Sequence, residues 1–299
     1  MTLYTHQDSN IRKTWFLMTT FLIVAIGLGW AVSAYFQSPV ILYIAVALSI
    51  IMNVGSYWFS DKLVIKMSGA RPVTHQEFPD LWNSLENLSI TAGLPMPKLY
   101  IITDPSPNAF ATGRNPEHSA VAVTTGLLQI LDKAELEGVL AHELSHIGNR
   151  DMLVATVVVV LVGFIAILSD IFIRSAQFGG GRDRDAGKVQ LVAFLAGIIL
   201  ALFAPLIAKL IHLAISRKRE FLADASGALL TRYPEGLASA LQKIGGYVGP
   251  MRHANHATAH LFISDPFDKE DRKSFFSKID KIFMTHPPIQ ERVNALRSS

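Results

Sequence analysis

The sequence predicts an α+β membrane protein with four transmembrane helices and a mostly helical polar domain that carries a small β-sheet. Three observations support this fold class. Several charge-free apolar blocks are long enough to cross a bilayer. Polar segments flank the later blocks, and these segments show both helical and strand periodicity. The chain has 299 residues, 50% of them hydrophobic and 17% charged, which is ample for a buried core.

The first apolar block, residues 14–60, contains no Asp, Glu, Lys, Arg or His. It is about twice the roughly 20 residues that a helix needs to span a bilayer. Because Pro39 divides the block, we expect a tight hairpin of two spans, at about 15–36 and 39–59. A cleavable signal peptide is the rival interpretation, since two basic residues precede the run. The second span, which follows at once, favours the hairpin.

Two further charge-free blocks cover residues 152–169 and 189–208. We expect spans at about 152–173 and 189–208, joined by a polar, glycine-rich link. A pair of buried core helices is the alternative interpretation of these blocks. The length of each block and the polarity of the link favour membrane spans.

Four spans put both polar parts on one side of the membrane. The expected divisions are an N-terminal transmembrane hairpin (1–60), a first polar part (61–151), a second transmembrane hairpin (152–208) and a second polar part (209–299). Basic residues near the spans are more numerous on the side of the polar parts. The positive-inside rule therefore predicts that these parts lie in the cytoplasm.

The polar parts contain recognisable elements. Residues 80–91 place leucines on one helical face, and residues 98–102 and 120–123 have the composition of strands. Residues 108–111 are a candidate edge strand. Asp132 is followed three residues later by a glutamate, the spacing of a capping box, so a helix should begin there.

That helix carries His142-Glu143-Leu144-Ser145-His146. A spacing of four residues puts both imidazoles on one helical face, close enough to share a tetrahedral cation. Glu143 projects beside the cation, where it can take a proton from bound water. The motif contains neither Pro nor Gly. The alternative is a pair of surface histidines that happen to bracket a glutamate.

A third ligand is needed, and no further histidine follows until His212. A glutamate from a second helix is a common solution in zinc enzymes, with the fourth position left for water. Residues 216–224 offer Glu220 and, four residues later, Asp224 on the same face. Glu220 could bind the metal while Asp224 accepts the outer N–H of a ligating histidine. A solvated charged helix end is the alternative.

Other features exclude whole classes of function. The chain has no cysteine, so disulfides, thiolate nucleophiles and Cys-based metal sites are ruled out. The formal net charge of +3 is small and no basic run is interleaved with aromatic residues, so we expect no nucleic-acid partner. His253, His256 and His260 form a spaced trio without a nearby carboxylate, which we interpret as a loop and not as a second metal site.

The chain resembles the HtpX-like membrane zinc metalloproteases over nearly its whole length; these are gluzincins and relatives of the CAAX prenyl endopeptidases. The matching motifs, in the same order, are Asn108–Ala111, His142–His146, Ser216–Asp224 and His286-Pro287-Pro288. The resemblance implies a zincin-type catalytic domain with one Zn²⁺ per chain. It also implies a multi-pass endopeptidase of the bacterial inner (plasma) membrane, which degrades misfolded or damaged membrane proteins in a stress response.

The resemblance also implies roles for individual residues. By this likeness the zinc ligands are His142, His146 and Glu220, Glu143 is the general base, and Asp224 supports a ligand. Four further expectations rest on the same family. Asn108 and Ala109 would pair with the substrate backbone, as an edge strand does, and His286 and Arg292 would lie near the metal and stabilise the oxyanion. An ordinary turn and a helix start are the alternatives for these two pairs.

Two rival functions remain. The first is a membrane holdase or scaffold in which zinc is purely structural, although Glu143 would then have no chemical task. The second is a CAAX-type protease of prenylated peptides, although four spans are too few to enclose its chamber. The expected partners are unfolded or membrane-protein substrates and the lipid bilayer. The sequence gives neither the cleavage preference nor the oligomeric state.

Overall fold

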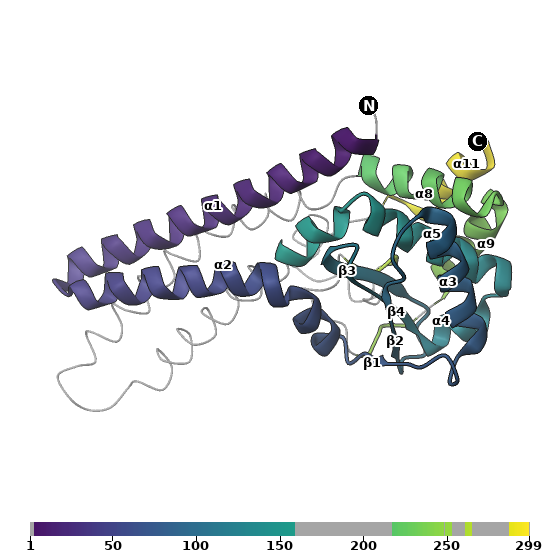
Figure 1. Ribbon diagram of the computed structural model, residues 1–299, viewed down its shortest axis with the longest axis horizontal. Coiled ribbons are helices and arrows are strands. Elements are labelled where there is room, and N and C mark those ends of the chain that lie inside the picture. Colours follow the sequence, from purple (N-terminus) through teal and green to yellow (C-terminus); the bar gives the residue numbers. More distant parts are fainter. Residues whose placement is uncertain (1–2, 159–216, 248, 253–260, 265–286, 299) are drawn as a thin grey trace.

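The computed structural model describes residues 3–158, 217–247, 249–252, 261–264 and 287–298 (Figure 1). In this part of the chain a long helical hairpin projects from a compact body that is mostly helical and contains one small mixed sheet. The mostly helical α+β fold with a small sheet is confirmed.

The hairpin consists of α1 (Leu3–Phe36) and α2 (Pro39–Met67), which pack along each other. The chain reverses at Gln37, which adopts a left-handed backbone conformation with φ of 54°. Pro39 then begins α2 at a position where its missing N–H costs no hydrogen bond. The predicted break between the two helices is therefore confirmed. Both helices extend beyond the predicted spans, α1 at its start and α2 at its end.

Within the described residues, α2 is the helix that is long and apolar enough to cross a membrane, judged by length and composition. The predicted third span is seen only as helical backbone at residues 151–158. The rest of it and the fourth span, at 189–208, lie outside the described residues. The count of four spans therefore stays a prediction.

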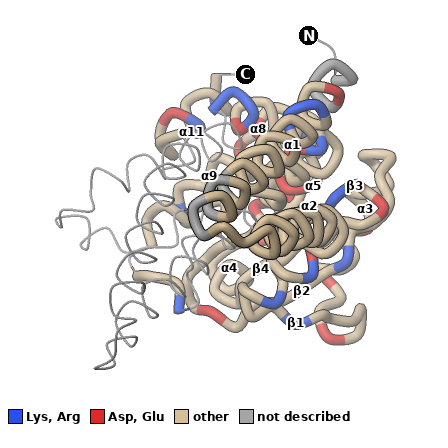
Figure 2. Tube along the Cα trace, turned by 90° about the vertical axis from the view of Figure 1, so that its left-hand side faces the viewer, with Lys and Arg blue, Asp and Glu red and all other residues tan. Residues whose placement is uncertain are grey.

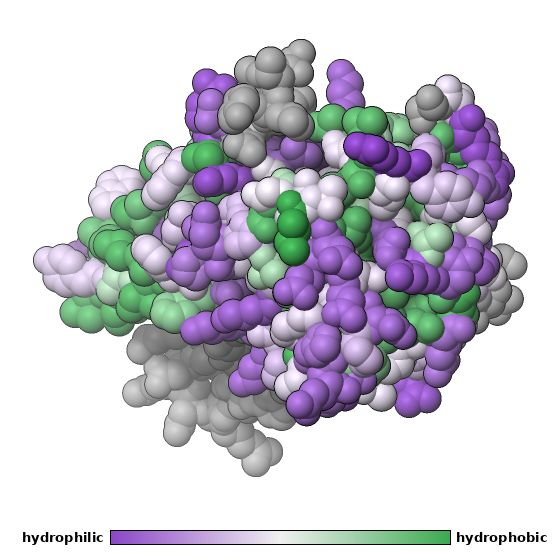
Figure 3. All heavy atoms as spheres, turned by 45° about the vertical axis from the view of Figure 1, so that its right-hand side comes forward, coloured by the Kyte–Doolittle hydropathy of each residue, from purple (hydrophilic) through white to green (hydrophobic). Residues whose placement is uncertain are grey.

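The hairpin is apolar on its outside. The exposed large hydrophobic side chains of the described residues lie mostly on α1 and α2, among them Trp30, Tyr43, Ile44 and Ile51. Viewed along the hairpin, α1 and α2 show long stretches without charged residues (Figure 2). Hydrophobic atoms gather over the hairpin, whereas hydrophilic atoms cover most of the body (Figure 3). This is the distribution expected of a helical pair that faces lipid.

The sheet has four strands in the order β1-β2-β4-β3. The strands are β1 (Arg71–Pro72), β2 (Lys98–Ile102), β3 (Ala109–Asn115) and β4 (His118–Thr124). β4 pairs in parallel with β2 and antiparallel with β3, while β1 is antiparallel to β2. β3 is an edge strand, as its sequence indicated.

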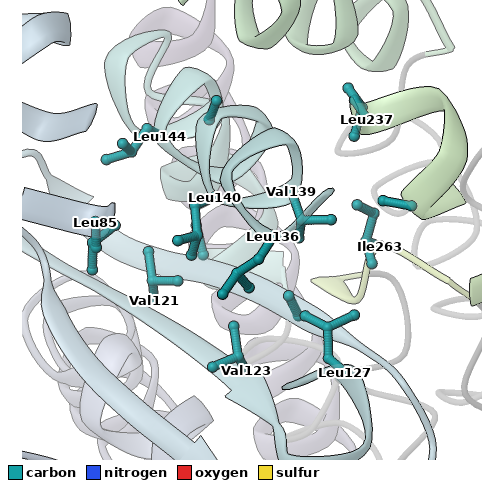
Figure 4. Close-up of a cluster of buried hydrophobic side chains, with 14 of the residues drawn as sticks. Leu85, Val121, Val123, Leu127, Leu136, Val139, Leu140, Leu144, Leu237 and Ile263 are labelled. Atoms are coloured by element: carbon teal, nitrogen blue, oxygen red, sulfur yellow. The ribbon is translucent and has the colours of Figure 1, made fainter. Parts of the chain in front are cut away.

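Helices cover the sheet and build the body. They are α3 (Pro79–Ala92), α4 (Thr125–Ile130), α5 (Lys133–Gly148), α8 (Arg217–Thr231), α9 (Pro234–Gly246) and α11 (Ile289–Ser298). On one face of the sheet, side chains of α5 such as Leu140 and Leu144 pack with Val121 and Val123 (Figure 4). On the other face, Phe110 packs with the end of α2 and with Phe262. One face of the sheet thus packs against α5 and holds it in position.

Helix α5 begins as predicted. The Asp132 side chain accepts from the backbone N–H of Glu135, and the Glu135 carboxylate accepts from the backbone N–H of Asp132, both at 2.9 Å. Glu135 also accepts from Lys243 of α9 at 2.6 Å. These contacts fix the start of α5 and connect it to α9. They therefore help to position the later turns of α5, which carry the H-E-x-x-H motif.

Candidate metal centre

The site forms where α8 crosses α5. A Cβ atom added at Gly227 of α8 would lie only 3.0 Å from the backbone nitrogen of His142 and 3.2 Å from the carbonyl carbon of Ala141. Glycine at this position therefore lets the two helix backbones approach closely. The crossing brings Glu220 and Asp224 of α8 against His142 and His146 of α5.

Three potential ligand atoms converge between the helices. The Nε2 atoms of His142 and His146 lie 3.2 Å apart. Glu220 places Oε2 at 3.8 Å from Nε2 of His142, and Oε1 at 3.6 Å from Nε2 of His146. One ligand atom from each of the three residues lies within 4.8 Å of the others. His142 and Glu220 are buried, and His146 is partly buried.

This donor set fits a divalent metal ion. Two imidazole nitrogens and a carboxylate are typical ligands of catalytic zinc, with a fourth position for water. Each histidine also has a carboxylate beside its other ring nitrogen: Asp224 Oδ1 lies 3.0 Å from Nδ1 of His142, and Asp151 Oδ2 lies 3.2 Å from Nδ1 of His146. A carboxylate at Nδ1 fixes the tautomer that leaves Nε2 free for a metal.

Arg292 of α11 is buried beside the site and binds Asp224. Its side chain is fully buried and donates to both carboxylate oxygens of Asp224, from Nε at 2.8 Å and from Nη2 at 2.6 Å. Nη2 lies 3.4 Å from Nε2 of His142, and Nη1 lies 3.8 Å from Oε2 of Glu220. Nη1 has no hydrogen-bond partner among the described residues.

Glu143 lies one residue after the first histidine and is 2% exposed. Its negative charge acts on both His146 and Arg292. The side chain is therefore near His146 and Arg292, in a region that the body shields from bulk solvent.

The charges of the site shift the pKa values of its members. Burial acts to raise the pKa of Asp224, but the hydrogen bonds from Arg292 and the close contact with His142 outweigh it and lower that pKa to about 2. Burial acts to lower the pKa of His146 in the metal-free protein. The hydrogen bond to Asp151 and the charges of Glu220, Asp151 and Glu143 outweigh this effect and raise the pKa to about 9. The carboxylates of the site thus favour a positive charge between them, whether a proton on His146 or a metal ion.

Asn108 and Ala109 are engaged with another part of the chain. The Asn108 side chain donates to the carbonyl oxygen of Ser264 and accepts from its backbone N–H, at 2.9 and 3.1 Å. The Ala109 carbonyl accepts from the backbone N–H of Ile263 at 2.9 Å. This end of the β3 edge therefore pairs with residues 263–264, and the substrate role of Asn108 and Ala109 stays a prediction.

Other predicted residues are not placed. His286 lies outside the described residues, as do His253, His256 and His260. Arg292 is placed, but its strongest contacts are with Asp224, which the predicted role in oxyanion stabilisation did not include.

Sequence reasoning missed Asp151 as the partner of His146. It lies five residues beyond that histidine, after α5 ends at Gly148 and after Arg150, whose left-handed backbone has φ of 57°. Helical spacing does not apply across such a reversal, so no periodicity indicated the contact. A useful signal would have been Asn149 and Asp151 directly after the helix, because asparagine and aspartate are common in turns.

A helix bearing H-E-x-x-H, joined to a glutamate from a second helix, defines the site of a metallopeptidase. Sequence similarity to known proteins agrees with this. The chain belongs to peptidase family M48, whose sequence model matches residues 75–299. Proteins named protease HtpX homolog are 44% identical in Caldanaerobacter subterraneus and Thermoanaerobacter pseudethanolicus, over 99% of this chain and 98% of theirs. A homolog from Tropheryma whipplei is 43% identical over the same shares. The crystal structure of S. mikatae Ste24p is similar with a TM-score of 0.49 and 18% identity, covering 98% of this chain and 67% of that chain.

Proposed function

We propose that this protein is a membrane-anchored zinc endopeptidase that hydrolyses internal peptide bonds close to the cytoplasmic membrane surface. The observation that carries the proposal is the convergence of His142, His146 and Glu220 beside the buried Glu143. Membership of a metallopeptidase family supports it. In this reading each chain holds one zinc ion, and the activity is that of a metalloendopeptidase.

A zinc ion held by the two histidines and Glu220 would supply Lewis acidity, which polarises the scissile carbonyl and acidifies the attacking water. Glu143 acts as general base: its carboxylate accepts a proton from that water and passes it to the leaving amine. Arg292 directs Nη1, which has no hydrogen-bond partner among the described residues, toward the same region. A guanidinium there stabilises the negative charge that develops on the carbonyl oxygen.

The apolar hairpin supports a location at the membrane. We propose four spans, at about 15–36, 39–59, 152–173 and 189–208, with the body in the cytoplasm of a bacterial cell and anchored to the inner membrane. The helix that starts at Asp151 leads from the metal site into the third proposed span. Because the site lies beside a span, its natural substrates would be misfolded or damaged membrane proteins, cut in loops or unfolded segments during stress.

The test is the substitution Glu143→Gln in the purified full-length protein. It removes the base while preserving the shape of the side chain, so zinc should stay bound and cleavage of casein should fall at least about 100-fold. Glu137→Gln is the matched control, because Glu137 is on the same helix but contacts Ser84 and Lys133 instead of the metal ligands. This control should cleave casein at the wild-type rate.

Cleavage by Glu143→Gln at the wild-type rate would refute the assigned base. Wild-type protein that contains zinc but cleaves neither casein nor unfolded membrane proteins would instead support a zinc-stabilised holdase. Cleavage restricted to prenylated peptides would support a CAAX-type protease.

A further inference from the structure

The first helix of the hairpin reaches the metal centre. Asn10 of α1 is only 2% exposed. Its Nδ2 atom donates to Oδ1 of Asp151 at 2.7 Å and to the carbonyl oxygen of Asn149 at 3.1 Å. Both amide hydrogens are thus used on the turn that ends α5. Asn10 is 139 residues from Asn149 in the sequence, so this contact joins two distant parts of the chain.

Asp151 connects Asn10 to a metal ligand. One carboxylate oxygen, Oδ1, accepts from Asn10, while the other, Oδ2, lies 3.2 Å from Nδ1 of His146. Asp151 is 7% exposed, so water competes little for these contacts. A chain of polar contacts therefore leads from α1 through one carboxylate to the imidazole whose Nε2 faces Glu220.

Charged groups also surround Asp151, but they do not replace Asn10. Nη1 of Arg219 lies 3.8 Å from Oδ1 of Asp151, beyond hydrogen-bond distance. Lys13, one turn after Asn10, is close enough for its charge to interact with Asp151 and Arg219. These cations attract the carboxylate, whereas the short Asn10 contact fixes the direction in which its two oxygens point.

We propose that Asn10 is a positioning residue for the metal centre: through Asp151 it orients His146, so that the seating of α1 against the body sets the affinity for the metal. The proposal rests on the metal site of the proposed function. It adds that the membrane hairpin does more than anchor the enzyme, because its first helix supplies part of the support for a ligand. Groups that hold a ligating histidine through its outer nitrogen change metal affinity or activity by about 10- to 100-fold when removed.

The first test is zinc affinity, measured by competition with a chelator on full-length protein in detergent. Asn10→Ala removes both donors, and Asn10→Asp keeps the shape but presents a carboxylate to Asp151 and to the Asn149 carbonyl. We expect each variant to raise the dissociation constant for zinc by about 10-fold or more. Asn53→Ala is the matched control, since Asn53 is a buried asparagine of α2 that donates to Ser49 within its own helix. It should bind zinc as the wild type does.

The second test asks whether Asn10 acts through Asp151. In a double-mutant cycle, Asn10→Ala should weaken zinc binding in the wild type but have little further effect when Asp151→Ala is already present. Visible absorption of the Co²⁺-loaded protein gives an independent readout, because its d–d bands report the geometry of the ligands. A variant that only lowers the stability of the fold would leave these bands unchanged. We expect altered bands for Asn10→Asp.

Wild-type zinc affinity and wild-type Co²⁺ spectra in Asn10→Asp would overturn the proposal. So would strictly additive losses in the cycle, since Asn10 would then act by another route. If the wild type binds zinc but does not cleave protein, the proposed proteolysis fails while the metal-affinity results still decide the role of Asn10.

Discussion

At the scale of single residues, Arg292 supports the metal site and has a second, proposed role in the chemistry. Its Nε and Nη2 atoms hold Asp224, and through it His142. Nη1 has no hydrogen-bond partner among the described residues and lies 3.8 Å from Oε2 of Glu220. The first role supports the metal site in the resting protein. In the proposed mechanism, the second acts when negative charge develops on the carbonyl oxygen of the substrate.

Substitution Arg292→Lys should separate these roles. Lysine keeps the charge beside Asp224 but lacks the planar fork that can bind a carboxylate and reach a second oxygen at once. We expect zinc content to persist, kcat to fall by about 100-fold and KM to change little. Arg297→Lys is the control, since Arg297 is half exposed and pairs with Glu235. A wild-type kcat for Arg292→Lys would show that Arg292 does not stabilise the negative charge on the carbonyl oxygen.

His146 gives the metal site a defined pH dependence. In the metal-free protein its pKa of about 9 lies above the ordinary value of 6.5. The protonated form therefore stabilises the metal-free fold below about pH 6.5, and this contribution disappears as the pH rises through about 9. Since zinc must displace that proton, zinc affinity should rise as the pH increases toward 9.

Calorimetry checks this directly. Titration of metal-free protein with zinc at pH 7.5, in buffers of different ionisation enthalpy, should show release of about one proton per zinc. The count should fall toward zero above about pH 9.5, where His146 is already neutral. Zinc binding without proton release at pH 7.5 would show that His146 is unprotonated in the metal-free protein.

At the scale of elements, the sequence predicted what depends on local spacing. The capping box at Asp132 and the break before Pro39 both follow from neighbouring residues, and both are present. Glu220 could be nominated because the motif on α5 lacked a third ligand. The contacts of Asp151 with Asn10 and of Asn108 with Ser264 join distant segments, and no local pattern indicates which distant groups meet.

The close crossing of α5 and α8 is the element-scale feature that most needs testing. In Gly227→Ala the new Cβ would press on backbone atoms of His142 and Ala141, which cannot rotate away. The helices would have to separate, at a cost of about 1–3 kcal/mol. We expect a lower Tm and weaker zinc binding. Gly246→Ala is the control, because nothing lies within 4 Å of its Cβ position. Equal Tm values for the two variants would show that the crossing tolerates a larger spacing.

At the scale of the whole molecule, the proposed location at the membrane puts the hairpin in lipid and the body in water. The absence of cysteine allows a clean test, because any introduced thiol is the only one present. Ile44 on α2 and Ile90 on α3 are both exposed, at 61% and 72%. In native membranes, a membrane-impermeant maleimide should label Ile90→Cys and leave Ile44→Cys unmodified.

Both thiols should react after denaturation in detergent, which serves as the control for reactivity. Orientation follows from the same variants: Ile90→Cys should be labelled in inside-out vesicles and protected in intact cells. Rapid labelling of Ile44→Cys in native membranes would contradict a lipid-facing hairpin.

The fold brings His142, His146 and Glu220 together from two segments that lie more than 70 residues apart in the sequence. The most direct test is the zinc content of full-length Glu220→Ala, measured by elemental analysis after dialysis, beside Glu235→Ala as an exposed glutamate control. We expect about one zinc per chain in the wild type and in the control, and little zinc in Glu220→Ala. Full zinc occupancy in Glu220→Ala would mean that α8 does not supply a ligand, and the metal centre as described would be wrong.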